Sequence, residues 1–262
     1  MRLVEAAGLY LSRGGRALLS DAGFSLESGE LHALLGANGA GKSTLLRILA
    51  GEWSPASGSV HLKGQPLQKL APLIQARCRA VLPQHDQLCF GFSVREVVAL
   101  GRLAARQRSR SHEANLIAEV MAATGIATLA TRSYPTLSGG EQRRVQLARV
   151  LAQVWDAEQP VLLLDEPTHS LDPAHQHHVM ELLRTLTMRG FGIAVSLHEL
   201  NLAAAYADRV SLLRAGRILT TGPVASVLNP ANLAATYGEA LHFTSVLQNE
   251  RPLWLSALKK TA

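Results

Sequence analysis

The sequence predicts an α/β fold in which a mostly parallel sheet is flanked by helices and joined by a smaller helical lobe. Short apolar runs that end at glycine or acidic residues alternate with helical patterns, an order typical of a parallel sheet covered on both faces. Roughly a hundred residues separate the first predicted helix from the next core strand, and their middle is helical in pattern. A length of 262 residues suits one core with an appended lobe.

The elements follow one another in a regular order. The first unit is a buried strand, a glycine-rich turn and a helix that ends at Gly51. A later helix has Asp172 as its N-cap, Pro173 at its first position and Gly190 at its end. The predicted elements are strands over 31–35, 161–164 and 192–197, a first helix over 43–50, lobe helices over 93–103 and 111–124, and short helical patterns over 224–228 and 231–237. A weakly patterned tail follows.

Composition argues against several classes of protein. No apolar run approaches the ~20 residues of a bilayer span, and the N-terminus lacks the apolar core of a secretory signal, so we expect a soluble chain that is not exported. Cys78 and Cys89 show no metal-binding or disulfide spacing and are predicted to be reduced thiols. The net charge of +6 favours a polyanion, either nucleotide phosphates, a membrane surface or nucleic acid. The basic stretch 102–110 contains no aromatic residue and is predicted to be solvated surface.

A phosphate-binding pattern, GxxxxGK[ST], lies between the first predicted strand and helix, as its mechanism requires. It comprises Gly36, Ala37, Asn38, Gly39, Ala40, Gly41, Lys42, Ser43 and Thr44. The glycines let backbone amides turn toward a triphosphate, and the helix N-terminus adds its positive dipole end. Lys42 is predicted to neutralise the β- and γ-phosphates, and the Ser43 hydroxyl to ligate Mg²⁺. A glycine-rich loop that only turns the chain is the alternative interpretation.

Two acidic residues, Asp165 and Glu166, follow the second apolar strand. Ligands collect at the carboxyl ends of strands in open α/β sheets. Asp165 is predicted to hold Mg²⁺ through a water molecule, and Glu166 to orient and polarise the water that attacks the γ-phosphate. Taken alone, two such acids are as compatible with a solvated turn, but the nearby phosphate-binding loop favours the catalytic interpretation.

The segment 137–142, Leu-Ser-Gly-Gly-Glu-Gln, resembles the signature loop of ABC ATPases and precedes an apolar helix over 145–155. Ser138 and Glu141 also have the spacing of a capping box, which would start any helix. In the family this loop closes on the γ-phosphate held by a second subunit. The resemblance therefore implies an isologous homodimer that buries two ATP molecules. The residues it implies for binding in trans are Ser138, Gly139, Gly140, Glu141 and Asp172.

Further elements of the resemblance occur in the family's order. Gln84 matches the glutamine that touches Mg²⁺ and the attacking water, and His198 matches the switch histidine that contacts the γ-phosphate. Asp172 matches the loop that crosses the dimer, so the implied catalytic residues are Glu166, His198 and Gln84, and the metal residues are Ser43, Gln84 and Asp165. Tyr10 is the candidate for stacking on adenine. Counting back from Gly29 places Leu11 at the family's usual position instead, and a core or surface tyrosine is the alternative for Tyr10.

The resemblance also implies an organisation of the chain. It is that of a P-loop NTPase of the ABC ATPase type, with a smaller antiparallel β region beside the parallel sheet. The implied nucleotide-binding core comprises 1–84 and 156–222, the helical lobe with the signature loop comprises 85–155, and a C-terminal helical extension comprises 223–262. Glu141 stands where the family more commonly has Gln, and we expect this change to be tolerated because backbone amides bind the phosphate. Glu199 stands where the family usually has Asp and is a longer acid with the same charge.

The chain is similar to the ATPases of importers for iron chelates, haem and cobalamin, through segments 90–102 and 198–203. Segments 151–155 and 175–178 resemble hemin-import ATPases, although the histidines of the second are not expected to bind haem. This implies a dimeric transmembrane permease, an indirect periplasmic substrate-binding protein, and a peripheral location on the cytoplasmic face of the bacterial inner membrane. The alternatives are ferric-siderophore or cobalamin import, export, or a non-transport ATPase acting on nucleic acid, although no nucleic-acid partner is expected.

Overall fold

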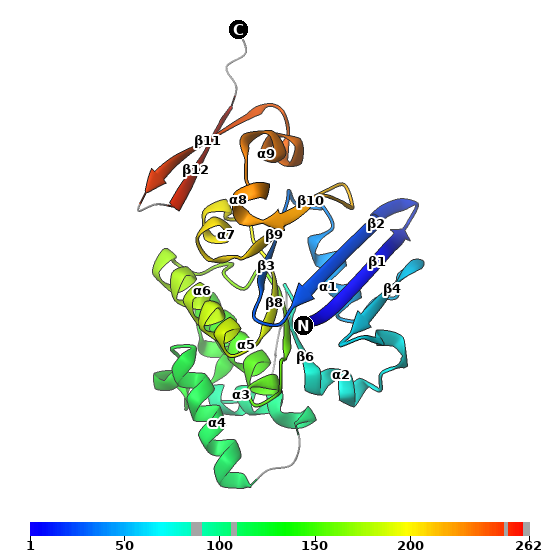
Figure 1. Cartoon of the computed structure of the whole chain (residues 1–262). Helices are drawn as coiled ribbons and strands as arrows, with labels where there is room; N and C mark the ends of the chain where they lie inside the picture. Colours follow the sequence, from blue (N-terminus) through cyan, green and yellow to red (C-terminus); the bar gives the residue numbers. More distant parts are fainter. Residues whose placement is uncertain (85–90, 106–108, 249–250, 259–262) are drawn as a thin grey trace.

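The computed structural model describes residues 1–84, 91–105, 109–248 and 251–258. Cys89 and parts of the segments 90–102 and 102–110 lie outside the described residues. The described residues form a central sheet of six strands, an antiparallel sheet of four strands and a two-stranded hairpin. Figure 1 shows the hairpin at the upper end of the molecule, beside α9, and helices α3 and α4 at the lower end.

The central sheet has the strand order β10-β9-β3-β8-β7-β6. Its strands are β3 (Leu31–Leu35), β6 (Arg79–Leu82), β7 (Val161–Asp165), β8 (Gly192–Ser196), β9 (Arg209–Arg214) and β10 (Arg217–Pro223). All neighbouring pairs are parallel except β9 and β10, which are antiparallel. The segments that follow β3, β6, β7 and β8 therefore meet at one edge of the sheet, and the predicted α/β fold class is confirmed.

The middle strands are apolar because both of their faces are covered. Every residue of β3, β7 and β8 is buried. Along β3, Ala33 and Leu35 pack into one core cluster with residues of the helical side, while Leu34 packs into a second cluster with Leu45 and Leu49 of the first helix. Alternate residues of a strand point to opposite faces, so the sheet separates the two clusters.

Most of the predicted helices begin within one residue of the predicted position, but the helix predicted over 145–155 begins at Gly139, and the helices over 72–78 and 200–206 were not predicted. The helices are α1 (Lys42–Leu49), α2 (Pro72–Cys78), α3 (Val94–Leu100), α4 (Arg110–Ala123), α5 (Gly139–Val154), α6 (Pro173–Met188), α7 (Leu200–Tyr206), α8 (Val224–Val227) and α9 (Pro230–Tyr237), with 3₁₀ segments at Leu67–Lys69, Gly101–Ala104, Ala127–Leu129 and Tyr134–Thr136. The Asp172 side chain caps α6 by accepting from the His175 backbone amide, and Pro173 is the first residue of the helix, as the sequence predicted.

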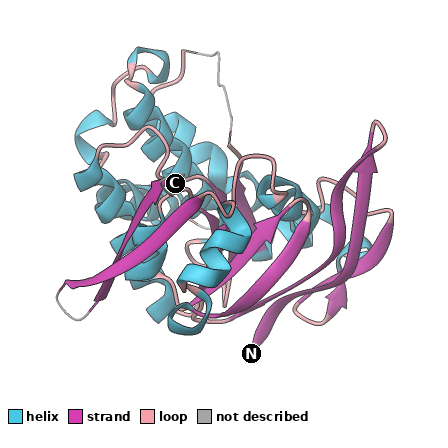
Figure 2. Ribbon diagram, turned by 90° about the horizontal axis from the view of Figure 1, so that it is seen from above, coloured by secondary structure: helices cyan, strands magenta, loops and turns pink. Residues whose placement is uncertain are grey.

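The antiparallel sheet contains the N-terminus of the chain. Its strands are β1 (Arg2–Arg13), β2 (Arg16–Glu27), β4 (Ser57–Leu62) and β5 (Gln65–Pro66), in the order β2-β1-β4-β5. Figure 2 shows these strands on one side of the molecule and most helices on the other. The helices α3 and α4 lie in the predicted lobe 85–155, but the boundaries of the lobe, the core and the extension stay predictions.

The tail differs from the predicted helical extension over 223–262. The helices α8 and α9 form, but β11 (Leu241–Gln248) and β12 (Arg251–Leu258) then pair as an antiparallel hairpin, so the helical description is wrong for these residues. A lone hairpin is marginally stable, and this one packs on α7 and α9 through buried Phe243 and Trp254. The Asn201 side chain donates to the Trp254 carbonyl at 3.2 Å and accepts from its amide at 2.7 Å.

The helices in the described part of the chain include none with both the length and the apolar character needed to cross a bilayer.

Candidate functional site

The loop between β3 and α1, where the sequence predicts phosphate binding, has a backbone conformation that favours glycine. Gly36, Gly39 and Gly41 have φ angles of 150°, 74° and 110°, which side chains rarely permit. A Cβ atom on Gly36 would lie 2.2 Å from the Leu213 carbonyl oxygen. The loop forms a cavity of about 250 Å³ with residues of three other segments. Its lining residues are Arg16, Leu18, Asn38, Gly39, Ala40, Gly41, Lys42, Ser43, Thr44, Gln84 and Glu166.

Lys42 is the buried cation of this loop. Its Nζ donates to the Gly36 carbonyl at 2.7 Å and to the Ala37 carbonyl at 3.3 Å. Burial lowers the pKa of the Lys42 ammonium, and the nearby carboxylates of Glu166 and Asp165 oppose this shift. An anion brought into the cavity would favour the charged form of Lys42.

Ser196, the last residue of β8, fixes the acidic pair at the end of β7. It is fully buried, donates its hydroxyl to Asp165 Oδ1 at 2.6 Å and accepts from the Glu166 amide at 3.0 Å. The sequence analysis missed this residue. A serine at the end of a buried strand was the available signal, but only the pairing of β8 with β7 places it beside the acids.

Three predicted catalytic residues meet at one carboxylate. Glu166 Oε1 lies 2.6 Å from His198 Nε2, and Glu166 Oε2 accepts from Gln84 Nε2 at 3.1 Å. Glu166 has a φ of 50°, a conformation that non-glycine residues seldom adopt and that is often found at functional sites. His169 Nδ1 lies 4.0 Å from Oε2. Gln84, Glu166 and His198 follow β6, β7 and β8 in turn, so the parallel sheet brings them together.

Arg143 of α5 binds the backbone on which these side chains stand. Its guanidinium donates to the carbonyls of Pro83 at 2.8 Å, Glu166 at 3.0 Å and Gln84 at 3.4 Å, and also to the Asp165 carbonyl. One side chain thus connects α5 to two loops, the one that contains Gln84 and the one that contains Glu166. The sequence analysis missed it, because a basic residue in the first turns of a helix carries no local signal.

The residues predicted to act in trans lie around a separate cavity of about 460 Å³. It is lined by Ser138, Gly139, Gly140, Glu141, Arg144, Ser170, Leu171, Asp172 and His175. All five predicted residues therefore share one surface, apart from the phosphate-binding loop, and the lining residues of the two cavities do not overlap.

The N-terminus of α5 has the predicted capping box. Ser138 Oγ accepts from the Glu141 amide at 3.3 Å, and Glu141 Oε2 accepts from the Ser138 amide at 2.8 Å and from its hydroxyl at 2.9 Å. These hydrogen bonds from Ser138 lower the pKa of the Glu141 carboxyl. The helix behind the box is buried from Val145 onward on its inner face, as predicted.

Tyr10 is placed differently from the other candidates. It lies in β1 opposite Ser57 of β4 and is 44% exposed, whereas its neighbour Leu9 is fully buried. It is not among the residues that line the phosphate cavity, where Arg16 and Leu18 of β2 stand instead. Stacking of Tyr10 on adenine stays a prediction that the geometry of this cavity does not support.

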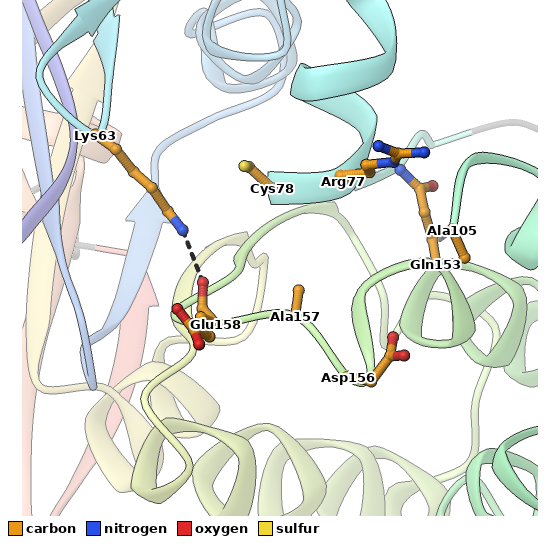
Figure 3. Close-up of a pocket in the computed structure, with 8 residues that line it drawn as sticks. All are labelled: Lys63, Arg77, Cys78, Ala105, Gln153, Asp156, Ala157 and Glu158. Atoms are coloured by element: carbon orange, nitrogen blue, oxygen red, sulfur yellow. Dashed lines mark hydrogen bonds between the residues drawn. The ribbon is translucent and has the colours of Figure 1, made fainter. Parts of the chain in front are cut away.

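A third cavity, of about 350 Å³, is shown in Figure 3. It lies beside Cys78, which precedes β6, and Glu158, close before β7, so it is at the edge of the sheet opposite the phosphate loop. Lys63 Nζ donates to the Glu158 carbonyl at 2.7 Å, and Asp156 pairs with Arg102 at 2.9 Å. These internal contacts give no indication of a ligand.

A family model described as ABC transporter matches residues 19–169. Hemin import ATP-binding proteins named HmuV are similar over most of the chain. The one from Gloeobacter violaceus is 47% identical over 240 residues, which cover 90% of this chain and 87% of the relative. The one from Photobacterium damsela subsp. piscicida is 41% identical over 255 residues, which cover 97% and 96%. The one from Nocardia farcinica is 48% identical, with 89% and 82% covered.

Solved structures share the fold. An ABC transporter in an inward-facing conformation matches with a TM-score of 0.81 at 25% identity, over 98% of this chain and 97% of that chain. The cbiO1 protein from Clostridium perfringens, part of the ABC transporter complex cbiONQ, matches with a TM-score of 0.76 at 26% identity, over 89% and 93%. Because the family model matches more than half of the chain and relatives at 41–48% identity cover most of it, the chain belongs to the ABC transporter family.

Proposed function

We propose that this chain is the ATP-hydrolysing subunit of an importer that carries hemin through a separate membrane permease. The observation that carries the catalytic part is the meeting of Gln84 and His198 on the Glu166 carboxylate, at the cavity formed by the phosphate-binding loop. A carboxylate held at both oxygens beside a triphosphate site is suited to orient an attacking water.

ATP is the proposed substrate, with its phosphates in the loop from Gly36 to Thr44. Ser43, Gln84 and Asp165 offer a hydroxyl, an amide and a carboxylate oxygen, a donor set that fits a hard divalent cation such as Mg²⁺. When bound, Mg²⁺ neutralises negative charge on the phosphate oxygens. Ser196 holds Asp165 Oδ1, which orients the second carboxylate oxygen.

The hydrolytic step depends on Glu166 in this proposal. Its carboxylate orients the water and draws a proton from it as the water attacks the γ-phosphorus, while the bond from that phosphorus to the β–γ bridging oxygen breaks and ADP leaves. Gln84 and His198 keep the carboxylate in place through the 3.1 Å and 2.6 Å contacts. Lys42, at the base of the loop, stabilises the negative charge of the phosphates during the reaction.

A homodimer completes the site. The phosphate cavity and the cavity around Ser138 are lined by different residues of one chain. In a two-fold dimer, the phosphate cavity of each subunit faces the backbone amides of Ser138, Gly139 and Gly140 in the other subunit. We propose that ATP binding closes this sandwich and that hydrolysis opens it, which moves a dimeric permease attached to the outside.

The relatives support the proposed cargo. Proteins named for hemin import match at 41–48% identity over nearly the whole chain, which supports hemin over ferric siderophores or cobalamin. The protein would then lie on the cytoplasmic face of the inner membrane, held there by its permease. A periplasmic binding protein would deliver hemin from the other side.

The test is to reconstitute the chain with its co-encoded permease in proteoliposomes and to measure ATP hydrolysis. Binding protein loaded with hemin, with a ferric siderophore or with cobalamin is added outside, and the Glu166→Gln variant is the matched control. We expect stimulation by the hemin-loaded protein, and no turnover with the variant.

The outcomes separate the parts of the proposal. Stimulation by a siderophore or cobalamin instead of hemin would make the cargo assignment wrong and leave the ATPase assignment standing. Hydrolysis that responds to duplex DNA and not to the permease would contradict transport altogether.

A further inference from the structure

A second basic side chain, that of Arg16, lines the phosphate cavity, and the resemblance assigns it no role. Arg16 and Leu18, from the start of β2, line the cavity together with the phosphate-binding loop. The Leu18 carbonyl oxygen lies 3.0 Å from the position of a Cβ on Gly41, and Arg16 Nη2 lies 3.6 Å from that position on Gly39. The beginning of β2 therefore lies against the loop, with the Arg16 guanidinium beside Gly39.

Arg16 has no partner of its own within the described part of the chain, where it donates no hydrogen bond and forms no ion pair. Its side chain is exposed. Lys42, by contrast, is buried and donates to the carbonyls of Gly36 and Ala37. Among the described lining residues these two are the cations, and Glu166 is an anion. A nucleoside triphosphate that enters the cavity brings more negative charge than Lys42 alone neutralises.

The neighbouring arginine, Arg13, contacts an aromatic ring and not the phosphate cavity. Arg13 is the cross-strand partner of Arg16 at the end of the β1–β2 pair. Its guanidinium carbon lies 3.9 Å from the centre of the Trp53 ring, and that of Arg47 lies 4.8 Å from the same ring. Arg13 is thus held by a cation–π contact and is not among the residues that line the cavity. Of the two arginines at this hairpin end, Arg16 is the one that faces the loop.

We propose that Arg16 is a second cationic ligand of the nucleotide, which contacts its phosphate oxygens in cis from the start of β2. The guanidinium is planar, stays charged at all physiological pH values and presents a fork of donors that matches phosphate. This inference rests on the proposed function, because it assumes that a triphosphate binds in the cavity.

The experiment is calorimetric titration of the full chain with ATP and, separately, with inorganic tripolyphosphate, which lacks a base and a ribose. The variants are Arg16→Ala, Arg16→Lys and the matched control Arg13→Ala, which removes the same charge from the opposite strand. We expect Arg16→Ala to raise the Kd of both ligands by roughly tenfold, Arg16→Lys to recover part of the loss, and Arg13→Ala to stay within about twofold. Arg16 is exposed at a hairpin end, so the thermal midpoint should not change.

Three results would overturn the inference alone, and a fourth would overturn the proposed function as well. Unchanged affinity of Arg16→Ala for both ligands would show that Arg16 does not contact the phosphates. Weaker binding of ATP without weaker binding of tripolyphosphate would place the contact on the base or ribose. An equal effect of Arg13→Ala would show that the loss of affinity comes from removing a positive charge near the cavity and not from a contact made by Arg16. Failure of the unmodified chain to bind ATP at all would overturn the proposed function, and this inference with it.

Discussion

Removing the Arg143 guanidinium should damage both stability and catalysis. It donates to carbonyls of two loops, those of Pro83 and Gln84 and those of Asp165 and Glu166. Hydrogen bonds to a charged group contribute about 1.5–3 kcal/mol each. Because the side chain is half-buried and water replaces part of the loss, we expect Arg143→Ala to lower the free energy of unfolding by about 2–4 kcal/mol.

The effect on turnover should be larger than the effect on binding. Displacing the backbone of Gln84 and Glu166 by about 1 Å is enough to cost roughly 100-fold in rate, and it is the carbonyls of these two loops that Arg143 binds. We therefore expect kcat to fall by about 10- to 100-fold with the Kd for ATP nearly unchanged. Arg143→Lys, which keeps the charge but offers no planar fork, should recover only part of both losses.

The assays are urea unfolding, ATP titration and steady-state hydrolysis on the same preparations. Arg144→Ala is the control for stability, because the hydrogen bond that Arg144 donates to the Gly125 carbonyl, at 3.0 Å, is exposed, and its loss should cost less than about 1 kcal/mol. The reasoning is refuted if Arg143→Ala unfolds like Arg144→Ala and hydrolyses ATP at the rate of the unmodified chain.

Three further predictions follow from the phosphate cavity. Burial lowers the pKa of Lys42 in the free chain, and bound phosphates should raise it again. ATP binding should therefore take up protons in the alkaline range between the pKa of Lys42 in the free chain and its pKa in the ATP-bound chain. Calorimetry in buffers of different ionisation enthalpy checks this, and Lys42→Arg should show no proton uptake. Ser196→Ala leaves Asp165 Oδ1 and the Glu166 amide without their partner and should cost about 1–3 kcal/mol in urea unfolding; a stability equal to that of the unmodified chain would contradict the role given to this hydroxyl. Gly36→Ala would place a methyl group 2.2 Å from the Leu213 carbonyl oxygen and should abolish ATP binding or folding; unchanged binding would mean that the loop can shift freely.

The local motifs were predictable because their meaning lies in adjacent residues. The glycines and Lys42 between a strand and a helix, and the acids after an apolar strand, identify themselves by spacing alone. Their meeting in space followed from the parallel order of the strands, which places the carboxyl ends at one edge. Gln84, Glu166 and His198 accordingly meet there.

The residues that were missed act across large separations in the sequence. Ser196 is 31 residues from Asp165, and Arg143 is 60 residues from Pro83. No spacing rule connects such pairs. The hairpin of the tail was missed because its strands are stabilised by tertiary contacts of Phe243 and Trp254 and not by a regular apolar alternation.

Dimerisation driven by ATP can be measured directly as the mass of the Glu166→Gln variant in solution, by light scattering, with and without ATP. The account predicts a monomer without nucleotide and a dimer that holds two ATP molecules when nucleotide is present, and a Ser138→Arg change in the same background should keep it monomeric. A variant that binds one ATP per chain and stays monomeric at every concentration would contradict the account.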